Sequence, residues 1–384
     1  WLSALSTIDL EEVGPTEPAE NDDDVAVVLF TSGTTSEPKS ALLRHRHLMA
    51  YLLGSVEFGS AEESEAVLVS VPPYHVAGVA NMLSNLFSGR RLVYLQSFSA
   101  QSWLDAVRRE AITHAMVVPT MLARVVDELD GEIVEHSTLR TLSYGGAKIS
   151  EKVIRAALAA FPTTGFVNAY GLTETASTIA VLGPDDHRAA LLSDDLHVQR
   201  RLSSVGQVLP MVEIEIRDEF ENVVSAGESG LIYLRGEQVS GEYAGVSLLD
   251  SEGWFCTRDQ GSIDTDGYLY IEGRVDDTII RGGENIAPAE IESVLLAQPG
   301  IAEACVVGLP DDEWGQRIVA VVVCSEGHVV DPKVLQDSVR DVLRGSKTPE
   351  EIIIRDSLPH TETGKMLRRV VLSELVARQG GTAS

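Results

Sequence analysis

Small hydroxyl residues gather around a single glycine in the segment LFTSGTTSEPKS, which runs from Leu29 to Ser40. A run of apolar residues leads into it from Val25, as a buried strand would. Backbone N–H groups and hydroxyls in such a turn can wrap the oxygens of a polyphosphate, and a lysine adds positive charge. A Ser/Thr-rich surface turn after a buried strand has the same composition, and the segment alone leaves the two interpretations about even. The candidate phosphate contacts are Thr31, Ser32, Gly33, Thr34, Thr35 and Lys39.

The residue before Lys39 excludes one familiar kind of phosphate site. A P-loop carries glycine directly before its Lys-Ser pair, at the mouth of a helix. Here that position is Pro38, which has no N–H to donate and a fixed φ. The segment is therefore not the phosphate loop of a P-loop NTPase.

Three further segments, together with this loop, resemble the adenylate-forming superfamily of acyl-CoA synthetases, nonribosomal peptide adenylation domains and firefly-type luciferases. The segment from Asn168 reads NAYGLTETAST, and the one from Leu358 reads LPHTETGKMLRR. Between them, from Gly253, runs GWFCTRDQGSIDTDGYLYIEGRVDDTIIRGGENIAPAEIE. Four long motifs in this order, from about Asp24 to Arg369, cover nearly the whole chain.

The resemblance implies a reaction in two halves, with ATP, Mg²⁺ and CoA. A carboxylate attacks the α-phosphate of ATP, giving an acyl-adenylate and pyrophosphate, and a thiol then attacks the acyl carbon and expels AMP. Two anions meet in the first half, so positive charge must be fixed where they meet. The phosphate loop departs from the family pattern at Ser36, where glycine is usual. A serine there stiffens the loop but removes no phosphate donor.

By the same resemblance, three residues act where the anions meet. Lys365, in TETGKMLRR, bridges the attacking carboxylate and the α-phosphate, although Gly-Lys alone would suggest a solvated patch with Arg368 and Arg369. Glu174, in YGLTE, matches the Mg²⁺-associated glutamate. One carboxylate is sufficient, because Mg²⁺ is commonly held by one or two carboxylates together with phosphate oxygens. Thr173 would bond the α-phosphate.

The adenine and ribose sites also follow from the resemblance. Asp259, in TRDQG, accepts from both ribose hydroxyls, and Arg274 is its companion, whereas the blander alternative is a surface Asp–Arg pair. Small residues let a flat purine approach the backbone on either side. The adenine slot has Gly145, Gly146 and Ala147 on one side and Asn168, Ala169, Tyr170 and Gly171 on the other.

The resemblance also implies a hinge, at Asp276, with the adjacent Asp277 as its rival. After adenylation the C-terminal unit would rotate there, removing Lys365 from the site. The loop RGGENI would then line a tunnel for the thiol, where Gly282 and Gly283 let a pantetheine arm pass close to the backbone.

The acyl site is expected near His75, in PPYHVAGVA, which aligns with an aromatic or histidine position beside the acyl carbonyl. A histidine satisfied within the core is a nearly even alternative. The VAGVANML stretch after it and residues Val118 to Thr120 are small and apolar and lack a counter-charge, which favours a fatty or aromatic acid over an amino acid. The basic cluster RHRHL, from Arg44 to Leu48, is expected to be an exposed helix start rather than a patch that steers ATP or CoA.

The elements that must position these residues are strands alternating with helical patterns, which is typical of an α/β fold. We expect a large N-terminal α/β body over residues 1–275, with a β-rich subdomain from Val205, and a small mobile C-terminal α+β domain over 276–384. By resemblance, a complete member has a further N-terminal portion before the phosphate loop. We expect that portion to be missing, since only 23 residues precede Asp24.

Composition limits the partners. The net charge of −28 disfavours nucleic acid and anionic membranes. Three cysteines without metal-type spacing fit a reducing compartment, no apolar run is long enough to span a bilayer, and no export signal is visible. These features predict a cytoplasmic protein, and a homodimer remains open.

Together these features predict an AMP-forming acid–thiol ligase that converts an apolar carboxylic acid into its acyl-CoA. Two alternatives stay open. One is an acyl-AMP ligase that loads the phosphopantetheine arm of a carrier protein, and the other is a catalytically impaired nucleotide-binding remnant.

Overall fold

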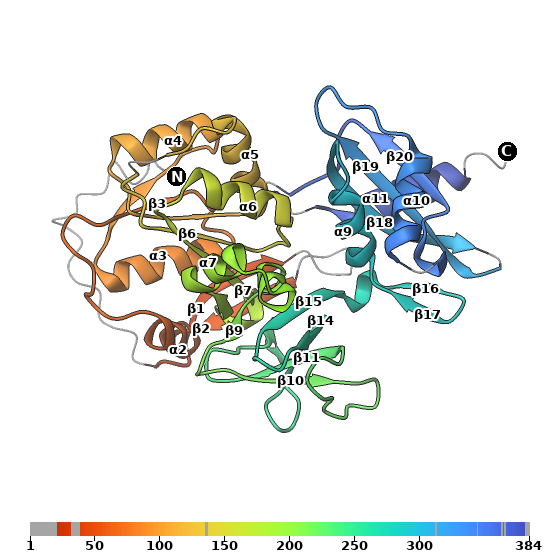
Figure 1. Ribbon diagram of the computed structural model, residues 1–384. Helices are drawn as coiled ribbons and strands as arrows, with labels where there is room; N and C mark the ends of the chain where they lie inside the picture. The colour runs from red at the N-terminus through yellow and green to blue at the C-terminus, as the bar shows by residue number, and fades with distance from the viewer. Residues whose placement is uncertain are drawn as a thin grey trace.

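The structure is a computed structural model in which a large body is followed by a smaller C-terminal unit (Figure 1). The body runs from β1 to β15 and the C-terminal unit from β16 to α11. The described residues are 21–31, 39–134, 137–311, 313–343, 345–361, 364 and 366–380.

A seven-stranded sheet forms the centre of the body, in the order β4-β3-β5-β6-β7-β8-β9. The first five strands in this order are parallel, whereas β8 and β9 are antiparallel. Strand β3 is buried at every position, as expected for a parallel strand covered on both faces. The strands are β3 (Ala66–Val69), β4 (Arg91–Tyr94), β5 (His114–Val117), β6 (Thr141–Gly145), β7 (Gly165–Leu172), β8 (Ser177–Leu182) and β9 (Gln207–Val208).

Two separate apolar cores hold the helices of the body, one against this sheet and one against β1 and β2. Trp103 of α4, Leu122 of α5 and Ile154 of α6 pack together against the central strands, and all three are fully buried. Helices α2 and α3 form the second core with β1 and β2. The helices are α2 (His45–Ser55), α3 (Val76–Ser88), α4 (Ala100–Arg109), α5 (Pro119–Leu129), α6 (Glu151–Ala160), α7 (Pro184–Leu192) and α8 (Leu196–Arg200), with 3₁₀ turns η1 (Thr173–Thr175) and η2 (Arg201–Ser203).

Two smaller sheets complete the body. In the first, β1 and β2 are antiparallel, and Thr31 pairs with Lys39, so the strands bracket the phosphate-loop segment. The second is the antiparallel sheet β10-β11-β14-β15, the β-rich subdomain expected from the sequence. Their strands are β1 (Val25–Thr31), β2 (Lys39–Arg44), β12 (Glu242–Tyr243), β13 (Val246–Ser247), β10 (Glu213–Arg217), β11 (Gly230–Arg235), β14 (Phe255–Ile263) and β15 (Leu269–Arg274).

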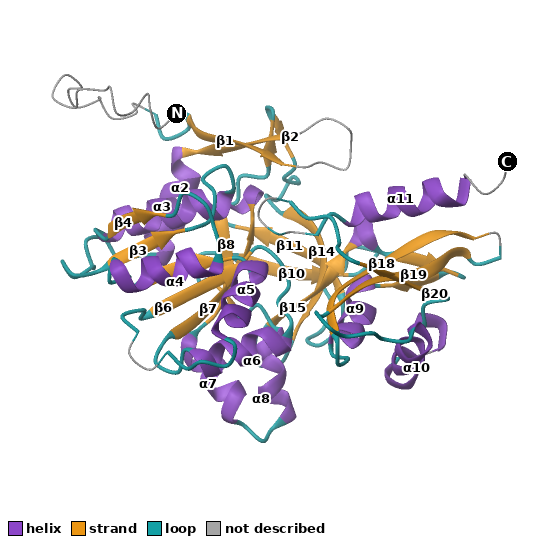
Figure 2. Cartoon of the chain, turned by 90° about the horizontal axis from the view of Figure 1, so that it is seen from above, coloured by secondary structure: helices purple, strands orange, loops and turns teal. Residues whose placement is uncertain are grey.

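The C-terminal unit is a three-stranded sheet, β18-β19-β20, with helices on both faces. Figure 2 shows α11 on one side of this sheet and α9 and α10 on the other, and each side has its own apolar core. A short hairpin, β16–β17, precedes it. The elements are η3 (Val275–Asp277), β16 (Ile279–Arg281), β17 (Glu284–Ile286), α9 (Pro288–Leu296), β18 (Ile301–Asp311), β19 (Gly315–Cys324), α10 (Pro332–Val342), η4 (Gly345–Lys347), β20 (Glu351–Arg355) and α11 (Arg368–Gly380).

The α/β fold class predicted from the sequence is confirmed. One local expectation is wrong: the basic cluster at the start of α2 is not wholly exposed. His47 is buried and accepts a hydrogen bond from the Arg44 backbone N–H on its Nδ1, 3.2 Å away, although Arg46 is exposed. Across the described part of the chain, we find no helix with the length and apolarity needed to cross a membrane.

Candidate active site

The carboxyl ends of the parallel strands gather several predicted residues at one edge of the central sheet. His75 follows β3, Thr120 follows β5, Gly145 ends β6, and Tyr170 lies near the end of β7. Neighbouring strands in this set are hydrogen-bonded to each other. Open α/β sheets bind ligands at this edge, because the loops that leave the strands diverge there.

Asp259 joins this edge from the β-rich subdomain. Tyr170 donates its hydroxyl to Asp259 Oδ2 at 2.6 Å, and Arg274 Nε lies 3.1 Å from Asp259 Oδ1. Asp259 and Arg274 are opposite each other on β14 and β15, which explains their proximity. Arg274 also donates to the carbonyl of Thr257 at 3.1 Å. The Asp259 side chain is buried, at 9% exposure, while the Arg274 side chain is 42% exposed.

Tyr170 remains a hydrogen-bond donor at ordinary pH. Burial raises the pKa of its hydroxyl well above the usual value, and the charge of Asp259 and the hydrogen bond to it act in the same direction. The neutral Tyr170 hydroxyl therefore donates to Asp259 Oδ2, and the ionised carboxylate is an acceptor of hydrogen bonds.

Glycine is required where β7 meets its two neighbours, β6 and β8. Gly145 pairs with Ala169, and a Cβ built on Gly145 would lie 2.2 Å from the Ala169 carbonyl oxygen. Gly171 is equally close to its neighbour, because its Cβ would lie 1.7 Å from the Ser177 carbonyl oxygen. These contacts let β7 lie close to β6 and β8 with no side chain at Gly145 or Gly171, as a flat ring would need.

Three other residues of the predicted adenine slot have different surroundings from Gly145 and Gly171. Asn168 is buried and donates its side-chain amide to the carbonyl of Ser204 at 3.2 Å, so its amide holds the strand in place. Gly146 has a left-handed φ of +83°, and it turns the chain so that Ala147 is exposed.

Glu174 lies in η1, beside the strand that follows the phosphate loop. Its side chain accepts a hydrogen bond from the Tyr243 hydroxyl, and its carbonyl accepts from the backbone N–H of Ser240 at 2.8 Å. Tyr243 pairs with Ala41 of β2. Glu174 is thereby tied to the base of the loop that the sequence predicts to hold phosphate, and Thr173 precedes it in the same turn.

Part of the predicted phosphate site lies outside the described residues: Ser32, Gly33, Thr34, Thr35 and Lys365. For Thr31 and Lys39 the structure describes the backbone, which forms the last pair of the β1–β2 ladder.

The residue before Lys365 shows how the C-terminal unit meets the body. A Cβ built on Gly364 would lie 1.9 Å from Thr120 Oγ1, so the backbone of this loop touches the start of α5. Nearby, Lys148 Nζ donates to Ser293 Oγ of α9 at 3.0 Å. Gly364 therefore lies at the same edge of the sheet as Gly145 and Tyr170.

His75 sits at the N-cap of α3, half-buried, with its ring centroid 4.8 Å from that of Tyr74. Its backbone N–H donates to the Pro72 carbonyl at 3.2 Å. A Cβ on Gly78 would lie 2.1 Å from the same carbonyl oxygen, so only glycine lets α3 start this close to the end of β3. The His75 backbone therefore has a fixed place at the edge.

The predicted thiol-tunnel glycines lie apart from the other site residues. Gly282 and Gly283 form the turn of the β16–β17 hairpin, with φ of +57° and +81°. Gly282 packs against Trp314, and the Arg281 guanidinium lies 4.9 Å from the Trp314 ring centroid. In Figure 1 the hairpin lies away from β6 and β7, on the far side of the C-terminal unit.

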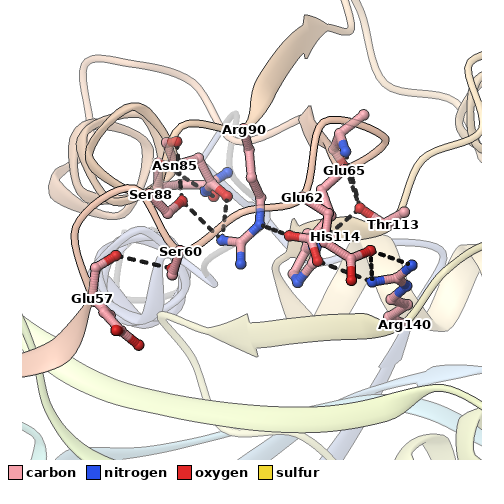
Figure 3. A network of polar contacts seen from close by, with 12 residues as sticks. Glu57, Ser60, Glu62, Glu65, Asn85, Ser88, Arg90, Thr113, His114 and Arg140 are labelled. Carbon is pink, nitrogen blue, oxygen red and sulfur yellow. Dashed lines mark hydrogen bonds and ion pairs between the residues drawn. The ribbon is translucent and has the colours of Figure 1, made fainter.

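A second polar cluster lies at the opposite, amino edge of the central sheet (Figure 3). Glu65 is its buried centre and accepts from Arg90 Nε at 2.7 Å and from Arg140 Nη1 at 3.0 Å. His114 Nδ1 lies 2.9 Å from Thr113 Oγ1 and 4.0 Å from Glu65 Oε2. Burial, followed by the charge of Arg90, lowers the pKa of His114 to about 4. These residues precede or begin β3, β4, β5 and β6, far from the motif residues.

Several contacts could not be found from sequence motifs. Tyr243 lies on a two-residue strand in no motif, so only its position beside Glu174 identifies it. Arg368 would be solvated in the patch interpretation, yet its guanidinium is held by Glu292 and lies 3.3 Å from Asp277. Arg258 occupies the middle of the TRD motif and pairs with Asp276.

The residues fit a nucleotide with its magnesium ion. A buried carboxylate suits the hydroxyls of a ribose, and the tight Gly145–Ala169 approach suits a flat base. Among the described residues no group of three or more His, Cys, Asp or Glu could hold a metal by itself. A single glutamate such as Glu174 suits Mg²⁺ that arrives with phosphate oxygens.

Comparison with known proteins agrees with this geometry. Residues 3–244 match the family model for AMP-binding enzymes, and residues 290–365 match that for the AMP-binding enzyme C-terminal domain. The indoleacetate–CoA ligase of Aromatoleum aromaticum is 32% identical, over 99% of this chain and 73% of its own length. The fatty acid–[acyl-carrier-protein] ligase ScoC of Streptomyces coeruleorubidus is 34% identical, over 92% and 69%.

Among solved structures, the o-succinylbenzoate CoA synthetase MenE of Bacillus subtilis, in complex with its acyl-adenylate intermediate, superposes with a TM-score of 0.79. It is 30% identical, and the match covers 91% of this chain and 69% of that one.

Proposed function

This chain belongs to the AMP-binding enzyme family, and from that premise we propose that it activates an apolar carboxylic acid with ATP and passes the acyl group to CoA. As a family member it is an acid–thiol ligase that forms an acyl-adenylate. The proposal extends to the residues that do so and to the class of acid. One observation carries it: Gly364, the residue before Lys365, lies against Thr120, at the edge that holds Tyr170 and Asp259.

In the first half-reaction, a carboxylate oxygen of the acid attacks the α-phosphorus of ATP. A P–O bond breaks, and pyrophosphate leaves. Asp259 and Arg274 hold the ribose, and the backbone at Gly145 and Gly171 forms the adenine slot. Lys365 holds the acid carboxylate and the α-phosphate together, and such fixed charge lowers the barrier between two anions.

The phosphates have their own contacts in this scheme. The loop from Thr31 to Lys39 wraps the β- and γ-phosphates, and Thr173 bonds the α-phosphate. Glu174 supplies one ligand to Mg²⁺, which neutralises phosphate charge when bound. Its link through Tyr243 to β2 supports this role, because it keeps the carboxylate beside the loop.

In the second half-reaction, the thiol sulfur attacks the acyl carbon and AMP leaves. We place the boundary between body and C-terminal unit at residues 275 and 276, with Asp276 as the hinge. Rotation there withdraws the TETGK loop and brings Gly282 and Gly283 to the body, where the pantetheine arm passes. The present separation of that hairpin from β6 and β7 fits the adenylating arrangement.

The acid is fatty or aromatic in this proposal. The stretch from Val76 to Leu83 and residues 118–120 offer apolar surface beside His75, without a charged partner for an ammonium group. Relatives named for indoleacetate and fatty acids support the same class. Three unpaired cysteines, Cys256, Cys305 and Cys324, suit a reducing compartment, and we place the protein in the cytoplasm.

Transfer to a carrier protein is the second candidate, because one relative is named as an acyl-carrier-protein ligase. A nucleotide-binding remnant without turnover is the third. A panel of fatty and aryl acids with ATP and Mg²⁺ separates them. We expect pyrophosphate release with an apolar acid and an acyl-CoA product when CoA is added. Release without thioester, but with acylation of a phosphopantetheinylated carrier, favours the second candidate, and no release with any acid favours the third.

The Lys365→Ala variant tests the site itself. Adenylation should fall on the order of 100- to 1,000-fold, while thioester formation from supplied acyl-adenylate should be preserved. Lys333→Ala, an exposed lysine at the start of α10, is the matched control and should match the wild type in both half-reactions. Equal loss of both half-reactions in Lys365→Ala would contradict the two-arrangement scheme.

A further inference from the structure

The two adjacent carboxylates of η3 are held by arginines from different parts of the molecule. Asp276 Oδ1 lies 2.5 Å from a terminal nitrogen of Arg258, which belongs to β14 of the body. Asp277 Oδ2 lies 3.3 Å from Arg368 Nε, at the start of α11 in the C-terminal unit. The peptide bond between Asp276 and Asp277 therefore joins a carboxylate held by the body to one held by the C-terminal unit.

Arg258 makes its contact from a strained backbone. Its φ is +61°, in the left-handed region where residues with a Cβ are disfavoured and glycine is not. The register of β14 against β11 shifts at this point, so the chain bulges over residues 257–259. Such bulges redirect side chains next to active sites. Here Thr257 and Asp259 are buried, while the Arg258 side chain is 59% exposed and reaches η3.

The pair between Arg258 and Asp276 adds little to the fold. Both side chains are open to solvent, at 59% and 29%, and exposed ion pairs contribute little to stability. A glycine at position 258 would reach the same φ without strain. A strained arginine at this position therefore points to a role other than stability. A weak contact is sufficient to bias two arrangements of similar free energy.

Arg368 extends this contact to the catalytic loop. It follows Lys365 by three residues, and its guanidinium is held by Glu292 and by the Val306 carbonyl, at 2.6 Å for the latter. Arg368 is thus fixed to α9 and β18 and connected through Asp277 to the junction. A change in direction at Asp276 consequently moves the start of α11 together with α9 and β18.

We propose that Arg258 is a positioning residue for adenylation: its ion pair with Asp276 holds the C-terminal unit in the arrangement that seats Gly364 on Thr120. This inference rests on the proposed function, in which the unit rotates at Asp276. Rotation about that backbone turns the Asp276 carboxylate away from β14, so the pair belongs to the adenylating arrangement and is lost in the thioester-forming one.

Three substitutions of Arg258 separate charge from strain. Arg258→Gly removes both, Arg258→Gln removes the charge, and Arg258→Lys keeps the charge. Single-turnover adenylation should fall about twofold to fivefold in Arg258→Gly and Arg258→Gln, as expected for one exposed ion pair. Thioester formation from supplied acyl-adenylate should be unchanged or faster. Arg258→Lys should retain the wild-type rate at low salt, and its rate should approach that of Arg258→Gln as salt is added.

Stability should respond in the opposite direction. Arg258→Gly should unfold at the same temperature as the wild type or higher, because the strain is gone. Glu221→Gly is the matched control, since Glu221 has a φ of +64° in a turn of the same subdomain. It should show the thermal gain without any change in either half-reaction.

The proposal is overturned if Arg258→Gly and Arg258→Gln adenylate at the wild-type rate, or if both half-reactions slow equally. Failure of the proposed function is a different result, in which the wild type adenylates no acid. The role of the Arg258–Asp276 ion pair is then tested without turnover, by cross-linking a Lys148→Cys, Ser293→Cys pair with a short bifunctional maleimide. Single-cysteine variants give the background from the native thiols. A lower cross-linking yield in the Arg258→Gly background supports the proposal, and an equal yield overturns it.

Discussion

Two buried carboxylates at opposite edges of the same sheet have similar exposure but different surroundings. Glu65, at the amino edge, has a side chain 10% exposed, and each of its oxygens accepts from a different arginine, at 2.7 and 3.0 Å. Asp259, at the carboxyl edge, has a side chain 9% exposed, a tyrosine hydroxyl on one oxygen and an arginine near the other. Among the described residues, Arg274 Nε has no partner aligned for a hydrogen bond.

The difference indicates which cluster holds the fold and which can receive a ligand. The Glu65 cluster brings together the starts of four neighbouring strands, and its charges neutralise each other. The Asp259 cluster joins two sheets and combines one negative charge with an arginine that is 42% exposed. A closed set of ion pairs stabilises, whereas a carboxylate beside a half-exposed guanidinium can bind a polar molecule.

Asp259→Asn should have the largest effect. The substitution keeps the size of the side chain but removes the negative charge of the carboxylate, which would accept hydrogen bonds from the ribose cis-diol. Hydrogen bonds to charged groups contribute about 1.5–3 kcal/mol, so kcat/KM for ATP should fall roughly 10- to 100-fold. Glu272→Gln, on the same strand as Arg274, is the control and should leave kcat/KM unchanged. A wild-type KM for ATP in Asp259→Asn would remove the ribose assignment.

Glu65→Gln should have the reverse profile. It leaves two arginines without their shared carboxylate, so the free energy of unfolding should fall by about 1.5–3 kcal/mol in urea. Activity per folded molecule should not change, because the cluster lies at the opposite edge from the site. Glu62→Gln is the matched control: Glu62 also pairs with Arg140, at 3.2 Å, but its side chain is 67% exposed. Its effect should stay within about 0.5 kcal/mol.

The contrast between the two clusters also shows what the sequence could predict. Asp259, Arg274, Tyr170 and Gly145 lie in or near motifs, and the structure brings them to one edge as expected. Glu65 lies in no motif. Its partners lie near other strands and are brought to it only by the register of the sheet, so local sequence does not reveal them.

The remaining gaps have the same physical origin. Burial of His47 and the contact of Tyr243 with Glu174 depend on how short strands pair, which neither periodicity nor composition encodes. The left-handed backbone of Arg258 is equally hidden, since its residue type favours the opposite φ.

Tyr170→Phe should have a smaller effect on the use of ATP than Asp259→Asn. The ring remains as a wall of the slot, but Asp259 loses its neutral donor. A hydrogen bond of this kind contributes about 0.5–1.5 kcal/mol, so KM for ATP should rise roughly twofold to tenfold. The catalytic constant should change little. A larger loss than in Asp259→Asn would indicate that the hydroxyl contacts the substrate directly.

His114→Gln should have the smallest effect at neutral pH, and its consequence appears only as the pH is lowered. The folded-state pKa of His114 is about 4, below the ordinary 6.5, so the unfolded chain binds more protons between these values. The stabilisation from the neutral histidine is therefore complete above pH 6.5 and lost as the pH falls toward 4. Removing His114 should reduce the slope of unfolding free energy against pH in this window by about 1.4 kcal/mol per pH unit. An unchanged slope, or an imidazole that titrates near 6.5 by NMR, would show that the amino-edge cluster does not exclude the proton, and its description as a closed set of ion pairs would fail.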